Sequence, residues 1–216
     1  DVYKRQMHRN TWNYGVRSAV GTGEGRTVGT SVTVIVPTFN ERENVAELVA
    51  RTAVALAGYD AEILFVDDST DSTAAEVERV AADAPLPVRV IHRTDNTGGL
   101  GGAVAVGLEA AASDLCIVMD GDLQHPPELL PALVRRHDEG DADVVAASRY
   151  IGGGDMSGLG TAVRFGVSRS ATWLTRAMFP IRLARSTDPM TGFFLVDRSR
   201  LDLSALRPQG FKILLE

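Results

Sequence analysis

The chain has 216 residues, of which 44% are hydrophobic and 23% are charged, as in a globular domain with a core of its own. Residues 1–30 carry five Lys/Arg and two Asp/Glu, so the net charge of −6 leaves −9 on residues 31–216. This acidic body argues against nucleic acid as a partner, and the single cysteine, Cys116, excludes a disulfide framework.

The first 30 residues show neither helical nor strand periodicity and are predicted to be a disordered tail. Residues 1–6 precede the first Met and are interpreted as non-native. From residue 31 onward, apolar strands alternate with amphipathic helices. Strands are predicted over 32–36, 63–66, 88–91, 115–119 and 144–147, and helices over 41–57, 71–82, 101–112 and 129–137. This alternation predicts an α/β fold with a doubly wound, mostly parallel sheet and helices on both faces. The sequence contains no run of 18 or more apolar residues, so no transmembrane helix is predicted.

Acidic residues follow three of these strands. Asp120-Gly121-Asp122 comes directly after the fourth strand, Asp67-Asp68 after the second, and Glu41 shortly after the first. The carboxyl ends of parallel strands open at one edge of the sheet, so five carboxylates are expected to converge there. They would repel one another unless a cation met them, and the aspartate pair with Gln124 suits a hard divalent metal. Taken alone, each acidic stretch is equally well interpreted as a solvated turn.

A glycine-rich stretch over 98–103 raises a rival hypothesis, an NAD-dependent dehydrogenase. It lies between a predicted strand and helix, with Asp120 about twenty residues later. Five residues separate the strand from the first glycine, however, whereas a dinucleotide loop turns directly off its strand. We therefore favour a flexible turn that shapes the wall of the cleft. No P-loop motif is present.

In this order along residues 31–216, the motifs resemble those of the family 2 glycosyltransferases of the GT-A fold. The likeness is greatest to the dolichyl- or polyprenyl-phosphate mannosyltransferases. The matching stretches are residues 36–41 (VPTFNE), 66–69 (VDDS), 120–128 (DGDLQHPPE), 148–150 (SRY), 188–194 (DPMTGFF) and 210–216 (GFKILLE).

The resemblance implies a role for each matching residue. The nucleotide sugar would be held by Pro37, Phe39, Glu41, Val66, Asp68, Asp120, Gly121, Asp122, Gln124 and Lys212. Mg²⁺ or Mn²⁺ would be bound by Asp120, Asp122 and Gln124, the first two forming an Asp-X-Asp motif. Asp122 and Arg149 would be catalytic, and the lipid phosphate would be bound by Arg149, Arg164 and Ser168. His125 is interpreted as a turn residue beside the metal. The family continues beyond the position where this chain ends, so residues 31–216 are expected to be a catalytic domain truncated at its C-terminus.

The resemblance further implies inverting transfer of a hexose, with GDP-mannose as donor and a polyprenyl or dolichyl phosphate as acceptor. Two alternatives stay open: a glucosyltransferase that uses UDP-glucose, and an inactive nucleotide-binding fragment. Residues 161–187 hold five arginines, no acid and interleaved apolar residues, a pattern suited to an anionic membrane surface. A core-packed helix with a solvated arginine face is the other interpretation of that segment. The predicted location is peripheral, at the cytoplasmic face of a membrane.

Overall fold

The computed structural model describes residues 30–140, 144–147 and 191–206. The chain divides into two compact units, one formed by Asp1–Val20 and Ala146–Thr191 and the other by Gly21–Val145 and Gly192–Glu216. Nearly all described residues belong to the second unit. Of the predicted tail, only residue 30 is among them.

A six-stranded sheet forms the centre of this second unit, in the order β3-β2-β1-β4-β6-β5. Its strands are β1 (Ser31–Thr38), β2 (Asp60–Asp67), β3 (Val88–His92), β4 (Leu115–Val118), β5 (Val144–Ala146) and β6 (Phe194–Asp197). Strands β3, β2, β1 and β4 run parallel to one another, whereas β6 pairs antiparallel with β4. Because the inner strands are covered on both faces, they are mostly apolar and buried along almost their whole length: β1 from Val32 to Thr38 and β2 from Ala61 to Asp67.

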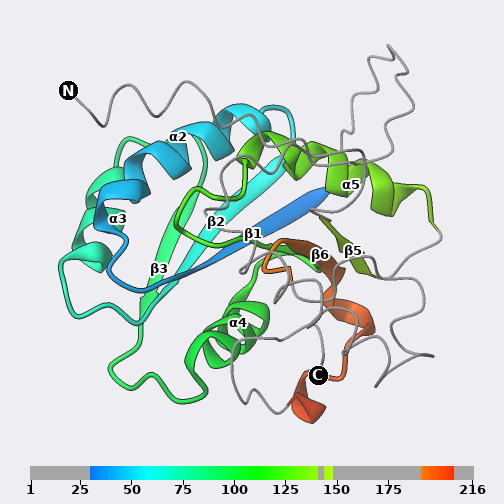
Figure 1. The fold of residues 1–216 in the computed structure, drawn as a ribbon. Helices are drawn as coiled ribbons and strands as arrows, with labels where there is room; N and C mark the ends of the chain where they lie inside the picture. The colour runs from blue at the N-terminus through cyan, green and yellow to red at the C-terminus, as the bar shows by residue number, and fades with distance from the viewer. Residues whose placement is uncertain (1–29, 141–143, 148–190, 207–216) are drawn as a thin grey trace, which may run out of the picture. The chain divides into compact units, whose positions relative to one another are not determined.

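Helices cover both faces of the sheet (Figure 1). The helices α2 (Val45–Ala55), α3 (Thr73–Ala81) and α5 (Leu130–Asp138) lie on one face, and α4 (Gly99–Ala110) lies on the other (Figure 1). Short 3₁₀ turns η1 (Arg42–Asn44) and η2 (Pro127–Leu129) precede α2 and α5, and η3 (Arg198–Arg200) and η4 (Leu203–Ala205) follow β6. Helix α2 buries Val45, Leu48, Val49 and Thr52, one stripe at helical spacing. Gly58, at φ +97°, follows its last turn.

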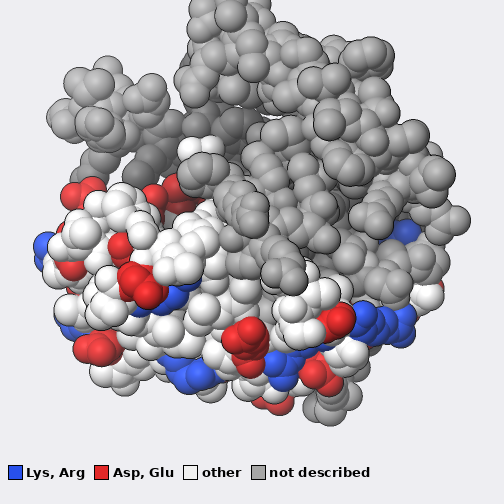
Figure 2. Space-filling view, turned by 90° about the horizontal axis from the view of Figure 1, so that it is seen from below, with Lys and Arg blue, Asp and Glu red and all other residues white. Residues whose placement is uncertain are grey.

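The predicted α/β class with a doubly wound, mostly parallel sheet is confirmed. Strand β6 was not predicted, and it inserts between β4 and β5. Within the described residues, no helix combines the length and the apolar character needed to cross a bilayer. On the face seen in Figure 2, Lys/Arg and Asp/Glu side chains of the described residues are interspersed rather than separated by sign.

Candidate active site

Pro37, Val66 and Asp120, three of the residues predicted to bind the nucleotide sugar, lie where the order of strands reverses. From β1 the chain proceeds to β2 and β3 on one side, whereas β4 joins β1 on the other side. Open α/β sheets bind ligands beyond the carboxyl ends of strands at such a point. Pro37 and Val66 are partners in the register of β1 and β2, and Asp120 follows the end of β4. The structure therefore brings these residues to one edge.

Gly121 allows the turn between the two aspartates to lie directly on the end of β1. A Cβ atom at Gly121 would lie 2.9 Å from Cγ2 of Thr38 and 3.6 Å from the carbonyl oxygen of Pro37. The first distance is shorter than real side-chain contacts, so a larger residue would push the turn away from the strand. The glycine sets how closely the two aspartates approach β1.

The second aspartate is fixed by its own turn. Oδ1 of Asp122 accepts a hydrogen bond of 3.0 Å from the backbone N–H of Gln124. Leu123, between them, adopts a left-handed backbone at φ +59°. That conformation costs a non-glycine residue roughly 1–2 kcal/mol, and such strain concentrates at functional sites. A carboxylate has about four acceptor positions, so this bond leaves Asp122 capacity for a ligand.

Glu41 lies within the electrostatic field of this turn. Partial burial raises the pKa of its carboxyl group, and the negative charges of Asp122, Asp120 and Asp71 raise it further. A hydrogen bond from Asn44 acts in the opposite direction without cancelling the rise. Burial is the largest cause, and the smaller contributions of Asp122 and Asp120 mean that carboxylates from the ends of β1 and β4 lie close enough to interact.

The two carboxylates at the end of β2 have partners of their own. Asp67 is fully buried: its Oδ1 accepts hydrogen bonds from the hydroxyls of Thr38 and Ser69, and its Oδ2 lies 2.9 Å from Nδ1 of His92. Asp67 therefore does not belong to the predicted cluster of five carboxylates that a cation would have to neutralise. Because these contacts join β1, β2 and β3, Asp67 stabilises the edge of the sheet.

Asp68, predicted to bind the nucleotide, forms a two-pronged ion pair with Arg93. The Nε atom of Arg93 donates to Oδ1 at 2.6 Å, and its Nη2 donates to Oδ2. The same guanidinium donates to the carbonyl oxygens of Thr97 and Gly99, at 3.1 and 3.0 Å. Arg93 therefore ties the turn after β2 to the glycine-rich stretch that opens α4. No sequence motif indicated a role for Arg93.

Phe39 presents an aromatic ring at this edge and is 58% exposed. Its loop is anchored by the next residue, Asn40, which adopts φ +58°. The backbone N–H of Asn40 donates to Oγ of Ser69 at 2.7 Å, and its side-chain oxygen accepts from the N–H of Thr70 at 3.1 Å. An exposed ring on an anchored loop is suited to stacking against a planar ligand.

His125, interpreted from sequence as a turn residue, is buried beside the first aspartate. Its Nδ1 lies 3.4 Å from Oδ2 of Asp120, and its ring stacks on Phe193 with centroids 5.2 Å apart. Its location beside Asp120 agrees with the prediction. Its contact with Phe193, the residue directly before β6, was not predicted, because β6 itself was not predicted.

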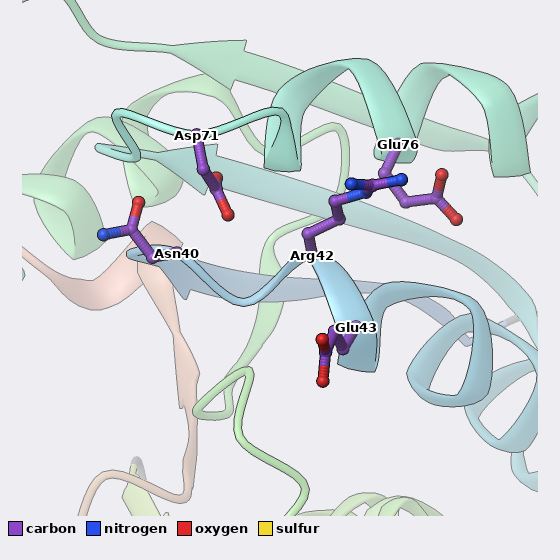
Figure 3. Close-up of a pocket in the computed structure, with 5 residues that line it drawn as sticks. All are labelled: Asn40, Arg42, Glu43, Asp71 and Glu76. Atoms are coloured by element: carbon purple, nitrogen blue, oxygen red, sulfur yellow. The ribbon is translucent and has the colours of Figure 1, made fainter.

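A separate polar hollow of about 590 Å³ is lined by Asn40, Arg42, Glu43, Asp71 and Glu76 (Figure 3). The guanidinium of Arg42 lies near Glu76 in this view (Figure 3). Hydrogen bonds within each acidic residue's own turn, to Thr73 and Arg79, and the charge of Arg42 lower the pKa of both Asp71 and Glu76. None of the predicted metal or nucleotide residues lines this hollow, so we do not assign the chemistry to it.

The aspartate turn is chemically suited to a divalent cation. Asp120, Asp122 and Gln124 offer oxygen atoms only, the donors that Mg²⁺ and Mn²⁺ prefer. Within the described residues, no three His, Cys, Asp or Glu side chains gather as a ready metal cage. Two carboxylates and one amide supply only part of the roughly six oxygens that such a cation takes, so oxygens of a diphosphate could complete the shell. The predicted residues Arg149, Arg164, Ser168 and Lys212, and the arginine-rich segment 161–187, lie outside the described residues.

Comparison with known proteins places this geometry in context. The family model described as Glycosyl transferase family 2 matches residues 33–202. A dolichol-phosphate mannosyltransferase of Pyrococcus furiosus is 40% identical over 186 residues, which are 86% of this chain and 51% of that protein. An undecaprenyl-phosphate 4-deoxy-4-formamido-L-arabinose transferase of an Enterobacter species is 39% identical over 120 residues, 55% of this chain and 36% of that protein.

The fold also matches solved structures. Glucosyl-3-phosphoglycerate synthase of Mycobacterium tuberculosis, solved with Mn²⁺, UDP-glucose and phosphoglyceric acid, aligns with a TM-score of 0.59 and 22% identity. The alignment covers 79% of this chain and 57% of that one. The chain thus spans about half the length of the Pyrococcus relative and somewhat more than half of this structure.

Proposed function

The chain belongs to glycosyltransferase family 2, and on this premise we propose that it carries the donor site of a hexosyltransferase acting on polyprenyl or dolichyl phosphate. The two relatives described above are named for polyprenyl-type phosphate acceptors but for different sugars. We propose mannose from GDP-mannose as the transferred sugar, because the Pyrococcus relative covers most of this chain. UDP-glucose is the alternative donor that the test below includes.

One observation carries the proposal: the Asp120-Gly121-Asp122 turn lies on the end of β1 at the reversal of strand order, with Gly121 against Thr38. A nucleoside bound over β1 and β2 would bring its diphosphate to this turn. In that position the ring of Phe39 would contact the base, and Glu41 and Asp68 would lie within reach of the sugar hydroxyls. Asp68 would act while held by Arg93.

Asp120, Asp122 and Gln124 would hold Mg²⁺ or Mn²⁺, which when bound neutralises charge on the departing diphosphate. The two carboxylates bind and orient; neither attacks the sugar. An acceptor phosphate oxygen would attack C1 and form the new C1–O bond. The C1–O bond to the diphosphate would break as it leaves with the electron pair, which inverts the configuration at C1. A phosphate monoester is mostly ionised at pH 7, since its second pKa is about 6, so the step needs no general base.

The acceptor side of the proposal rests on the resemblance. Arg149, Arg164 and Ser168 would bind the lipid phosphate, with arginine forks matching its oxygens, and Lys212 would face the donor phosphates. The arginine-rich segment 161–187 would contact an anionic membrane surface at the cytoplasmic side.

Binding and turnover of the 216-residue chain test the donor assignment. We expect GDP-mannose to raise the melting temperature only when Mn²⁺ is present. A donor at ten times its Kd adds about 1.4 kcal/mol, or roughly 3–6 °C for a chain of this size. UDP-glucose and NAD are assayed in parallel, and transfer to a short-chain polyprenyl phosphate is followed with labelled sugar.

The variant Asp122→Asn should lose the Mn²⁺-dependent shift, whereas Glu76→Gln, in the separate hollow, should keep it. A larger shift with UDP-glucose would reassign the sugar. Stabilisation by NAD without metal, or by no nucleotide sugar at all, would refute the proposed function.

A further inference from the structure

Strand β6 brings the residues that directly precede it to the same sheet edge as the end of β4. The two strands are antiparallel, with Val118 opposite Phe194. Continuing this register by two residues places Gly192 opposite Asp120. This juxtaposition joins two points more than 70 residues apart in the sequence.

Gly192 leaves the space that the carboxylate of Asp120 occupies. A Cβ atom at Gly192 would lie 2.7 Å from Oδ2, 2.9 Å from Oδ1 and 3.1 Å from Cγ of Asp120. Gly192 does not have a left-handed backbone, so its conformation does not require glycine. The requirement is for space: the carboxylate group occupies the volume that any other side chain would fill.

His125 borders the same carboxylate. Its Nδ1 lies 3.4 Å from Oδ2 of Asp120, and stacking on the fully buried Phe193 limits the ring's movement. Phe193 directly follows Gly192 in the chain. The same short segment therefore holds the ring of His125 in place and leaves space for the carboxylate of Asp120. Asp120 is itself partly exposed, with 37% of its side chain accessible.

We propose that Gly192 and His125 are positioning residues that set the orientation of Asp120 for the metal and the donor diphosphate. The inference rests on the proposed function, in which Asp120 is a metal ligand. It goes further, because it assigns the segment directly before β6 a task at the donor site. Neither residue would touch the sugar; both would act through the carboxylate.

The geometry predicts an unusually selective defect. In Gly192→Ala, the atoms that the new methyl group meets are the end of one flexible side chain rather than backbone. The inexpensive adjustment is rotation of Asp120 away from its position, which leaves the sheet intact. Groups that orient metal ligands typically contribute 10–100-fold to metal affinity, and we expect a loss of this size.

Electron paramagnetic resonance of Mn²⁺ in the presence of GDP, and separately UDP, measures this affinity without turnover. We expect Gly192→Ala to raise the Kd of Mn²⁺ by 10–100-fold with little change in the urea midpoint. His125→Phe, which preserves ring stacking but removes the nitrogen, should also weaken binding. Gly140→Ala is the matched control: its methyl group meets nothing within 4 Å and its position, φ +80°, makes it the more strained substitution.

A double-mutant cycle separates positioning from other effects. If Gly192 acts through Asp120, then Gly192→Ala should cause no further loss in an Asp120→Ala background. An equal loss in both backgrounds, or wild-type affinity in Gly192→Ala, would overturn the inference and leave the proposed function standing. If the wild-type chain binds no Mn²⁺ with either nucleotide, the metal site and this inference fail together.

Discussion

Replacing Arg93 with alanine should lower the free energy of unfolding by about 3 kcal/mol, although no ligand is involved. The side chains of Arg93 and Asp68 are only 9% and 10% exposed. Arg93 makes two hydrogen bonds to the carboxylate and one each to the carbonyl oxygens of Thr97 and Gly99. Its removal would leave a nearly buried carboxylate and two carbonyl groups without this donor.

The magnitude follows from the burial of the pair. Breaking a buried ion pair by removing one partner costs roughly 3–5 kcal/mol, because the remaining charge stays desolvated. A tenth of each side chain is accessible, so water can partly solvate Asp68 and the lower end of that range applies. For a chain of this size, 3 kcal/mol corresponds to a fall in melting temperature of about 6–12 °C.

Urea unfolding followed by circular dichroism measures the loss. Arg79→Ala provides the matched control, because Arg79 also pairs with a carboxylate, Glu76, but on the exposed surface of α3. It should have little effect. In Asp68→Ala/Arg93→Ala the orphaned carboxylate is gone, so the double variant should be more stable than Arg93→Ala alone.

Two results would refute this reasoning. One is an Arg93→Ala variant as stable as Arg79→Ala. The other is a double variant whose destabilisation equals the sum of the two single losses, which would mean that Arg93 and Asp68 stabilise the fold independently.

Three further predictions concern the core. Burial acts to raise the pKa of Glu62, but hydrogen bonds from Arg89, from the Ala112 N–H and from Thr33 outweigh it and lower the pKa. The stabilisation by Glu62 is therefore lost as the pH falls through the lowered pKa. Glu62→Gln should flatten the acid side of the pH profile of stability measured in urea, and an unchanged slope would contradict this. Burial raises the pKa of Cys116 to about 12, so a thiol reagent at pH 8 should label the unfolded but not the native chain; rapid native labelling would show the interpretation to be wrong. A Cβ atom at Gly107 would overlap Cγ2 of Ile35. Gly107→Ala should therefore force α4 away from the sheet and lower the free energy of unfolding in urea by about 1–3 kcal/mol. A variant of full stability would refute the tight packing.

Much of the fold was predictable because its strands are covered on both faces. Uninterrupted apolar runs such as Ile63–Val66 indicate burial on both faces, and the glycine after α2 indicates where that helix ends. Strand β6 escaped prediction for a physical reason. Its apolar run reads equally well as part of a binding motif, and its partner β4 lies far away in the sequence. Periodicity reports which residues are buried, but it does not report which strand pairs with which.

The candidate site was predictable to the same limit. The aspartates were identifiable because each follows a strand, a local property. The groups that neutralise or orient them were not, since Arg93 and Gly192 contribute only through tertiary contacts. Arg93 did leave one signal: it is the basic residue directly between β3 and the glycine-rich stretch. Nothing in the sequence indicates that it pairs with Asp68 rather than facing solvent.

The pairing pattern has a consequence for how the donor would bind. Asp67 and Asp68 are screened by His92, Thr38, Ser69 and Arg93. Burial is the main cause of the raised pKa of Glu41, and the negative charges of Asp122 and Asp120, beyond the end of β4, raise it further. A nucleoside diphosphate would add negative charge to the same place. A divalent cation that offsets this repulsion must therefore raise nucleotide affinity, and by linkage the nucleotide must raise metal affinity by the same factor. In the proposed function, the two carboxylates of the turn would bind a cation together with the oxygens of the diphosphate.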